Sequence, residues 1–416
     1  MESARYSYRP LTDHWKINLL QWIDQSYSHF CWTDGNNYKY PQGSFQTQLL
    51  AGNRELGEEE IWKTPNSKRA GIISYDFKNQ IEKLKSTNPE FFSLPDLCFF
   101  EAEFELVLVE GQFRSSQPIP DWIWGNNPNR ISNNLVSFSP QIDKATYLDR
   151  FAEIQQEIIE GNTYELNFCQ AFEGVFEEFN PIDAYLELNR ISPMPFSALF
   201  KANKKYLISA SPERFIKKTG SQLIAQPIKG TAKRNPDPTI DQHNRERLKN
   251  SEKEKAENLM ITDLMRNDLS KVSKTASVKV PELFGIYAFP KVFQMISTVS
   301  SELKPDISFE EIIKATFPMG SMTGAPKIKT MEIIEEKESF NRGWFSGALG
   351  IIEPNGDFDF SVIIRSIICD LSIKKLYFGV GSAITIDADA ESEYEECLLK
   401  AEAIFKTLRG ENYTPN

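Results

Sequence analysis

Apolar residues recur along this chain with a spacing of three or four in several segments, which predicts amphipathic helices. Residues 143–160 place Tyr147, Phe151, Ile154 and Ile158 on one face, and Gly161 follows as a helix terminator. Further helices are predicted over 181–190, over 241–271, over PDISFEEIIKATF with an N-cap near Asp306, from about Pro326, and over 390–408. In 241–271, the residues expected to mark the buried side are Ala256, Leu259, Met260, Met265 and Leu269.

Other segments alternate apolar and polar residues, or run apolar for five to eight positions, as strands do. These segments are LCFFEAEFELVLV, YELNFCQAFEGVF, SALFKANKKYLISAS, ERFIKKTG, SQLIAQPIK, KVFQMISTVSSEL, WFSGALGIIEP, FDFSVIIRSIICD and KLYFGVGSAITI. Several follow one another directly, so strands and helices are mixed without strict alternation. This pattern predicts an α+β fold of layered antiparallel β-sheets flanked by helices.

The segment from Glu110 to Ile142 is rich in Pro, Asn, Ser and Gln, and it is predicted to be a loop or linker. It divides the chain into a first portion, 1–140, that forms sheet and ends in this linker, and a second portion, 141–416, that holds the candidate chemistry. A length of 416 residues is compatible with one large domain or two interlocked domains.

Composition narrows the class of protein. A formal charge of −11 and the lack of a basic tract argue against nucleic acid or an anionic membrane as partners. Five scattered cysteines without a CxxC pair indicate buried thiols in a reducing compartment and no zinc site. No signal peptide or membrane-length apolar run is visible, so a cytoplasmic location is expected. With three histidines, acid–base chemistry is expected to rest on carboxylates and lysines.

The run LIAQPIKGTAKR, residues 223–234, is the stretch around which the candidate chemistry gathers. It is predicted to be a strand that ends in a turn after Lys229, which would aim this lysine from a rigid platform. The alternative interpretation is a surface lysine beside a turn.

Two pairs of glutamates lie three residues apart on predicted helices. Glu393 and Glu396 share a stripe with Lys400, and Glu254 and Glu257 lie beside the apolar run LMITDLM. Together they could form an oxygen-ligand cage suited to Mg²⁺. Either pair could instead be an ordinary charged helix surface.

Further groups indicate a pocket for a small dianion. The loop GSMTGAPK lacks the Gly-Lys-Ser/Thr of a phosphate loop, but its amides at a helix start would favour an anion such as a carboxylate. Gly379 and Gly381 would let the backbone approach a ligand at a strand end. Arg365, within the predicted strand SVIIRSII, is a core cation that needs a partner.

These motifs together resemble a known family. SPERF, QPIKGTAKR, AENLMITDLMRNDL, GSMTGAPKIKTMEII, VIIRS and GVG…ESEYEECLLKAEAI are similar to segments of the chorismate-utilising enzymes, above all the first components of aminodeoxychorismate synthases. The similarity is dense from about Ser209 to Phe405 and extends more weakly over nearly the whole chain.

The resemblance implies a role for each of these positions. It places metal ligands at Glu257 and Glu396 with Glu254 and Glu393 in support, a general acid at Glu213, and carboxylate-binding groups at Arg365, Lys400, Ser321 and the Gly379–Gly381 turn. It also implies that the Lys229 amine attacks C2 of chorismate, that the C4 hydroxyl leaves with help from Glu213, and that ammonia then adds at C4. Aminodeoxychorismate synthases typically carry lysine before Gly230, whereas anthranilate and isochorismate synthases carry alanine.

The implied reaction requires shifted pKa values at two residues. Lys229 would need its pKa brought from about 10.4 to about 7–8 by burial and nearby positive charge, and Glu213 would need to stay protonated through burial. Two positions depart from other family members. Glu165 replaces the lysine that activates water in isochorismate synthases, and Gln294 replaces a histidine tied to pyruvate loss in anthranilate synthases.

The implied product is 4-amino-4-deoxychorismate, for 4-aminobenzoate and folate synthesis. No glutaminase signature is visible in the sequence, so a separate glutamine amidotransferase subunit, or free ammonia, is expected to supply nitrogen. Two alternatives stay open: component I of an anthranilate synthase, and a non-catalytic chorismate-binding subunit.

Overall fold

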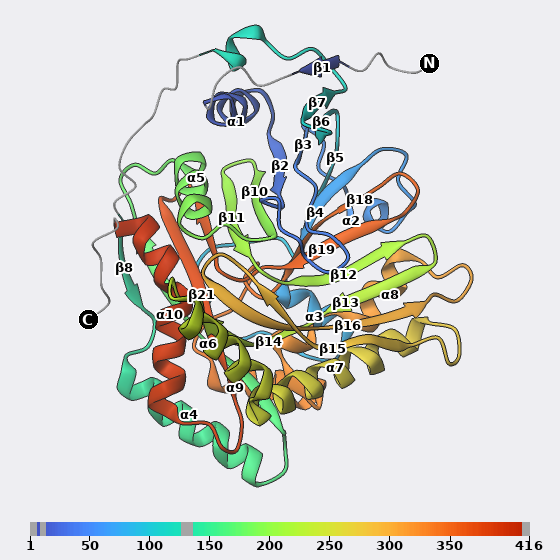
Figure 1. Cartoon of the computed structure of the whole chain (residues 1–416). Coiled ribbons are helices and arrows are strands. Elements are labelled where there is room, and N and C mark those ends of the chain that lie inside the picture. The colour runs from blue at the N-terminus through green and yellow to red at the C-terminus, as the bar shows by residue number, and fades with distance from the viewer. Residues whose placement is uncertain (1–5, 9–13, 126–135, 410–416) are drawn as a thin grey trace.

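The computed structural model describes residues 6–8, 14–125 and 136–409, and two antiparallel sheets dominate it (Figure 1). Helices cover these sheets, so the predicted α+β class of layered antiparallel sheets flanked by helices is confirmed. Each sheet draws strands from widely separated parts of the chain, and the topology therefore brings distant motifs together.

The larger sheet has twelve strands among the described residues. Its order is β1 (Tyr6–Tyr8), β7 (Gln112–Ser115), β6 (Phe104–Val109), β3 (Gln48–Gly52), β2 (His29–Asp34), β10 (Phe196–Ala202), β11 (Lys205–Ser211), β20 (Ser366–Asp370), β21 (Lys375–Ile384), β9 (Glu165–Val175) and β17 (Gly324–Ala325), with β8 (Ser137–Pro140) also paired to β9. The long strands β21 and β9, near one end of this order, pair over ten residues of register, from Lys375 opposite Val175 to Ile384 opposite Leu166.

The smaller sheet has nine strands in the part of the chain that the structure describes. Its order is β14 (Ile228–Lys233), β16 (Val292–Glu302), β13 (Gln222–Gln226), β12 (Arg214–Thr219), β19 (Phe358–Val362), β18 (Ala348–Ile352), β4 (Arg69–Ile73) and β5 (Leu97–Glu101), with β15 (Lys279–Ala288) also paired to β16.

Two large apolar cores hold the layers together. One lies between the twelve-stranded sheet and helices that include α1 (Trp15–Ser26), α4 (Lys144–Ile159), α5 (Pro181–Ile191) and α10 (Ala390–Arg409). The other combines strands of both sheets with α7 (Glu252–Val272) and α8 (Phe309–Thr316). The remaining helical segments are α2 (Glu58–Ile61), α3 (Lys78–Ile81), α6 (Pro238–Asn250), α9 (Lys327–Lys337) and the 3₁₀ turns η1 (Tyr75–Phe77), η2 (Asp121–Trp124) and η3 (Gly320–Met322).

Four long helices match their predictions closely, namely α4, α5, α9 and α10, but two helix details are wrong. The segment 241–271 is two helices, because Ser251 caps α7 by accepting a hydrogen bond from the Glu254 amide. The helix after it is capped by Ser308, which forms a capping box with Glu311, whereas Asp306 has φ of 59° and lies outside the helix.

The segment 110–142 is not simply a linker. Glu110 and Gly111 both have positive φ and close a two-residue hairpin between β6 and β7, and β8 adds to β9. Residues 126–135 of this segment lie outside the described part. The division of the chain at residue 140 stays a prediction, although strands from both sides of it pair in each sheet, as β2 with β10 and β4 with β18.

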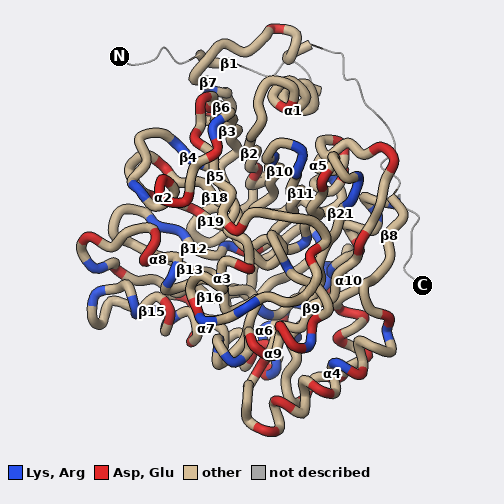
Figure 2. The backbone as a smooth tube through the Cα atoms, turned by 180° about the vertical axis from the view of Figure 1, so that it is seen from behind, with Lys and Arg blue, Asp and Glu red and all other residues tan. Residues whose placement is uncertain are grey.

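Charges are distributed over the molecule without a separate basic face in the view of Figure 2, where acidic and basic positions alternate along many elements. All five cysteines are free and buried, as predicted. Within the described ranges, none of the helices combines the length and apolar character needed to cross a bilayer.

Candidate active site

Lys229 lies at an irregularity between two strands. Pro227 has no amide hydrogen and separates β13 from β14, and the chain then continues as a strand through Lys233, so the predicted turn after Lys229 is wrong. Ile228 opposes Ile296 while Thr231 opposes Gln294, which leaves one extra residue in β14 around Lys229 and Gly230. Such a bulge redirects a side chain out of the regular alternation. Gly230 has φ of 91°, a conformation that favours glycine.

The bulge turns Lys229 inward. Its side chain is 11% exposed, so the alternative of a surface lysine is wrong. Its Nζ donates a hydrogen bond to Oε1 of Glu165 at 2.7 Å, and the Glu165 side chain is 1% exposed. Glu165 was not predicted to be a site residue, although its position as a carboxylate on the apolar strand β9 is a signal for a buried partner. Oε2 of Glu165 has no hydrogen-bond partner among the described residues.

The charges around Lys229 differ from those expected. Burial lowers the pKa of this amine, but the neighbouring carboxylates of Glu165 and Glu257, the hydrogen bond to Glu165 and the charge of Glu213 outweigh burial, and the pKa is raised. The expectation of a pKa lowered to about 7–8 by nearby positive charge is therefore wrong for this ligand-free arrangement. The amine is held as an ammonium, and any nucleophilic role requires that a proton leave it first.

Glu213 lies between β11 and β12, in the turn predicted for it, and is 5% exposed. Burial raises the pKa of its carboxyl to about 7, against the opposing effects of the Ser321 hydroxyl and of the Lys229 and Lys400 charges. A carboxyl with this pKa is protonated in a large fraction of molecules near neutrality, as a general acid must be. The Ser321 hydroxyl is close enough to affect Glu213 but makes no hydrogen bond of ordinary geometry with any described residue, so it is available to a ligand.

The four predicted metal ligands come from α7 and α10. Glu257 and Glu393 are buried, while Glu396 is exposed and Glu254 is intermediate. Glu254 lies against the bulge, because a Cβ built on Gly230 would be 3.0 Å from its Oε2. These positions place the carboxylates beside Lys229 rather than on an unrelated helix surface.

A lysine bridges the two helices through their carboxylates. Lys253 Nζ is 3.3 Å from Glu393 Oε1 and 3.9 Å from Glu257 Oε1. Burial and then the charge of Glu396 raise the pKa values of Glu254 and Glu393, and burial raises that of Glu257 to about 7. An ammonium between buried, mutually repelling carboxylates indicates a place for a cation, and oxygen donors are the type that Mg²⁺ takes. No group of three or more His, Cys, Asp or Glu side chains in the described ranges is close enough to hold a metal ion without rearrangement.

Two cations border this cluster. Lys400 Nζ lies 2.8 Å from both Glu396 Oε1 and the Gly381 carbonyl oxygen. Arg365 is not within a strand as predicted: β19 ends at Val362 in one sheet, β20 begins at Ser366 in the other, and Arg365 makes the crossing with φ of 51°. Its guanidinium has no hydrogen bond or ion pair with any described residue, and burial lowers its pKa against the charge of Glu396. A partly buried, unpaired arginine is suited to bind a carboxylate.

The two glycines are inside β21 and not in a turn at a strand end. A Cβ on Gly379 would be 2.4 Å from the Phe345 ring, and one on Gly381 would be 2.5 Å from Cys169 Sγ. Both positions therefore need glycine for packing between layers, and the approach of their backbone to a ligand stays a prediction. The Gly381 carbonyl oxygen accepts a hydrogen bond from Lys400, which borders the site.

The floor of the site is fixed by a buried ion pair. Arg342 donates two hydrogen bonds to Glu338, at 2.8 and 2.6 Å, and others to the carbonyl oxygens of Met322 and Asn167. It thus ties the GSMTGAPK loop, which carries Ser321, to β9, which carries Glu165. α9 begins after this loop with Pro326 at its N-cap, as predicted.

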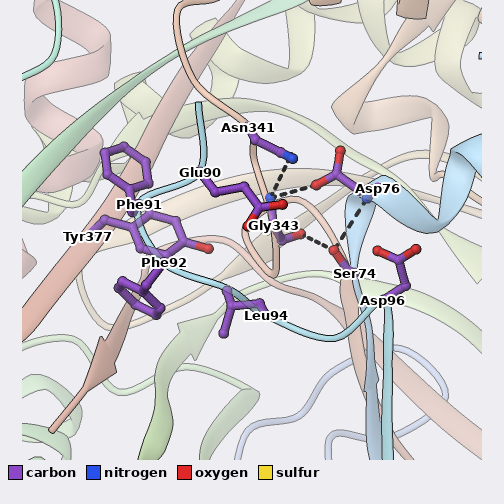
Figure 3. A pocket seen from close by; sticks show the side chains of 10 residues that line it. All are labelled: Ser74, Asp76, Glu90, Phe91, Phe92, Leu94, Asp96, Asn341, Gly343 and Tyr377. Atoms are coloured by element: carbon purple, nitrogen blue, oxygen red, sulfur yellow. Dashed lines mark hydrogen bonds between the residues drawn. The ribbon is translucent and has the colours of Figure 1, made fainter. Parts of the chain in front are cut away.

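A separate hollow, partly open to solvent, lies elsewhere (Figure 3). Its lining includes the aromatic rings of Phe91, Phe92 and Tyr377 and the carboxylate of Asp76, and it contains none of the predicted site residues. Asp76 already accepts hydrogen bonds from the Gly343 amide and the Ser86 hydroxyl. We therefore place the candidate site at Lys229 and not at this hollow.

The chain is similar to known proteins over most of its length. Residues 25–406 match the family model described as chorismate binding enzyme. Aminodeoxychorismate synthase component 1 of Escherichia coli K12 is 33% identical over 350 residues, covering 81% of this chain and 76% of that protein. The chloroplastic aminodeoxychorismate synthase of Arabidopsis thaliana is 38% identical over 364 residues, covering 80% of this chain and 39% of that protein.

The fold is also that of a solved structure. Anthranilate synthase component I from Streptococcus pneumoniae TIGR4 superposes with a TM-score of 0.73 at 22% identity, covering 98% of this chain and 93% of that one. The match of the family model to nearly the whole chain decides the assignment. The chain belongs to the chorismate binding enzyme family.

Proposed function

We propose that this protein is component 1 of an aminodeoxychorismate synthase, which converts chorismate and ammonia to 4-amino-4-deoxychorismate for 4-aminobenzoate and folate synthesis in the cytoplasm. The observation that carries the proposal is the buried amine of Lys229, set beside the carboxyl of Glu213 and bordered by two cations, Arg365 and Lys400. The names of the E. coli and A. thaliana relatives support it.

The proposed reaction has two substitutions. The neutral Lys229 amine forms a bond to C2 of the ring, the ring double bonds shift, and the C4–O bond breaks as Glu213 gives its proton to the departing oxygen, so water leaves. Ammonia then forms a bond to C4, the double bonds shift back, and the C2–N bond breaks, which returns a neutral Lys229. Arg365 and Lys400 hold the carboxylates of the substrate and so fix the ring against the amine.

Mg²⁺ fits the donor type and the charge of the carboxylate cluster. We expect Glu257 and Glu396 to hold it, with Glu254 and Glu393 in support, and Lys253 to move aside. The ion would supply a template that orients a carboxylate of the substrate. Nitrogen would come from a glutamine amidotransferase subunit, which agrees with the word component in the name of the E. coli relative, or from free ammonia.

Product identification tests the proposal. Purified protein is incubated with chorismate, Mg²⁺ and an ammonium salt, and the products are separated and identified by mass spectrometry, with and without a lyase that completes 4-aminobenzoate formation. The expected product is 4-amino-4-deoxychorismate. Fluorescent anthranilate as the main product would instead establish an anthranilate synthase, and chorismate binding without turnover would indicate a non-catalytic subunit.

A lysine substitution tests the nucleophile. Lys229→Ala should lower kcat by about 10³-fold or more, because it removes the group that forms the C–N bond. The matched control is Lys233→Ala, which removes an exposed lysine from the same strand and should leave kcat unchanged. Turnover of Lys229→Ala at the rate of the control would exclude Lys229 as an obligatory nucleophile.

A further inference from the structure

Glu165 accepts a hydrogen bond from the amine that the proposed reaction needs, and its carboxylate can accept a proton from that amine. We propose that Glu165 is the positioning residue of Lys229 and the acceptor of the proton that leaves its ammonium group before C–N bond formation. The inference rests on the proposed function for the fate of the amine, but the contact between the two residues can be tested independently.

Lys229 and Glu165 are joined by a direct hydrogen bond along which a proton can be transferred. Nζ of Lys229 lies 2.7 Å from Oε1 of Glu165, and both side chains are nearly excluded from solvent. Each residue comes from a strand, β14 and β9, that is anchored in a different sheet. The second oxygen, Oε2, is buried and unpaired, so the carboxyl group can take up a proton without breaking another hydrogen bond among the described residues.

Other charged groups also face Lys229, but none of them is proposed to accept its proton. The carboxylates that affect its amine or are affected by it are Glu165 from β9, Glu213 from the β11–β12 turn, Glu254 and Glu257 from α7, and Glu396 from α10. Within the described residues, Glu165 alone among them lies within ion-pair distance of Nζ. Glu213 is required as the acid for the departing oxygen, which leaves Glu165 as the available base.

The step balances. One N–H bond of the Lys229 ammonium breaks and an O–H bond forms on Glu165, which converts an ammonium and a carboxylate into a neutral amine and a carboxylic acid. The lone pair that stays on Nζ forms the bond to the ring carbon, while the proton of Glu213 leaves with the C4 oxygen as water. No redox change occurs, and no further reactant is needed.

The substitution Glu165→Gln separates proton acceptance from simple charge stabilisation. If Glu165 only stabilised the ammonium, its loss would free the amine and raise kcat at neutral pH. If Glu165 accepts the proton, kcat should fall by about 10²-fold or more with little change in KM, because general-base catalysis contributes about 10²- to 10⁴-fold. Glu165→Asp, which keeps the carboxylate but shortens the side chain, should recover part of the loss.

The control lies on the same strand. Glu173 in β9 pairs with Lys375 at 2.7 Å, the same distance, but both side chains are more exposed. Glu173→Gln should leave kcat, KM and Lys229 unaffected. Urea unfolding of all variants checks that each is folded. If Glu165→Gln fails to fold, Glu165→Ala with added formate replaces it, and a saturable rescue of turnover by formate is expected.

Chemical labelling tests the contact without reference to turnover. Wild type, Glu165→Gln and Glu173→Gln are treated briefly with acetic anhydride, and acetylation of Lys229 is mapped by mass spectrometry. Glu165→Gln should label several-fold faster at Lys229 and yet turn over more slowly. Unchanged labelling would overturn the positioning role, and unchanged or increased kcat would overturn proton acceptance. Failure of the wild type to form 4-amino-4-deoxychorismate would refute the proposed function instead, while labelling would still report on the pair.

Discussion

The buried pair of Arg342 and Glu338 offers the clearest energetic prediction. Both side chains are 1% exposed, and two hydrogen bonds join the guanidinium to the carboxylate. Replacing Arg342 by Met removes these bonds together with those to the Met322 and Asn167 carbonyl oxygens. Among the described residues, the Cys169 amide is then the remaining hydrogen-bond donor to Glu338. Breaking a buried ion pair in this way costs about 3–5 kcal/mol, so we expect Arg342→Met to lower the free energy of unfolding by about 4 kcal/mol.

Urea denaturation followed by tryptophan fluorescence measures this loss, since the buried Trp344 lies two residues away. The double variant Arg342→Met with Glu338→Gln should recover about 2 kcal/mol, because an uncharged amide replaces the unpaired carboxylate. Arg190 provides the control: it contacts Glu187 through the same two-bond geometry, at 3.0 and 2.8 Å, but on the surface. Arg190→Met should cost less than about 1 kcal/mol. Equal losses for Arg342→Met and Arg190→Met would refute the reasoning.

Two further predictions concern turnover. Glu213 must be protonated to act as the acid, and burial raises its pKa to about 7. The kcat should therefore be highest below this pH and fall as the pH rises through about 7. A Glu213→Gln variant that keeps the wild-type rate would contradict the assignment. Removing divalent cations with a chelator should abolish turnover, and added Mg²⁺ should restore it. Glu257→Gln should raise the Mg²⁺ concentration needed for half-maximal turnover by about tenfold. Full activity in the presence of the chelator would argue against a metal.

Periodicity predicted the long elements because their signal is local. The helices α4 and α10 each bury one face, and the strands β10, β11 and β13 are buried along nearly their whole length, so either pattern can be recognised within a dozen residues. The side of α7 that packs inward was harder to predict. Leu259 is half exposed there, while Glu257, Asn258 and Asp268 are buried, so the polar residues of the site reverse the usual pattern.

Features that depend on two sheets at once were not predictable in this way. FDFSVIIRSIICD is continuous in sequence pattern, yet Arg365 leaves one sheet for the other. Similarly, Lys229 and Glu165 are 64 residues apart, and their contact depends on the approach of β14 to β9. The resemblance to a family located the groups with chemistry, but the electrostatic surroundings of Lys229 follow from tertiary packing alone.

Charge balance links the separate proposals for this site. Six carboxyl groups, Glu165, Glu213, Glu254, Glu257, Glu393 and Glu396, gather with four cations, Lys229, Lys253, Lys400 and Arg365. With all of them ionised, the site is already anionic, and a dianionic substrate would be repelled. Protons on Glu213 and Glu257, whose pKa values are raised to about 7, reduce this excess, and a divalent cation among the carboxylates would reverse it. Transfer of the Lys229 proton to Glu165 leaves the net charge of the site unchanged, because it neutralises one ammonium and one carboxylate together. The excess of acidic groups therefore supports two proposals jointly: a metal ion that allows a dianion to bind, and a protonated Glu213 that acts as the acid.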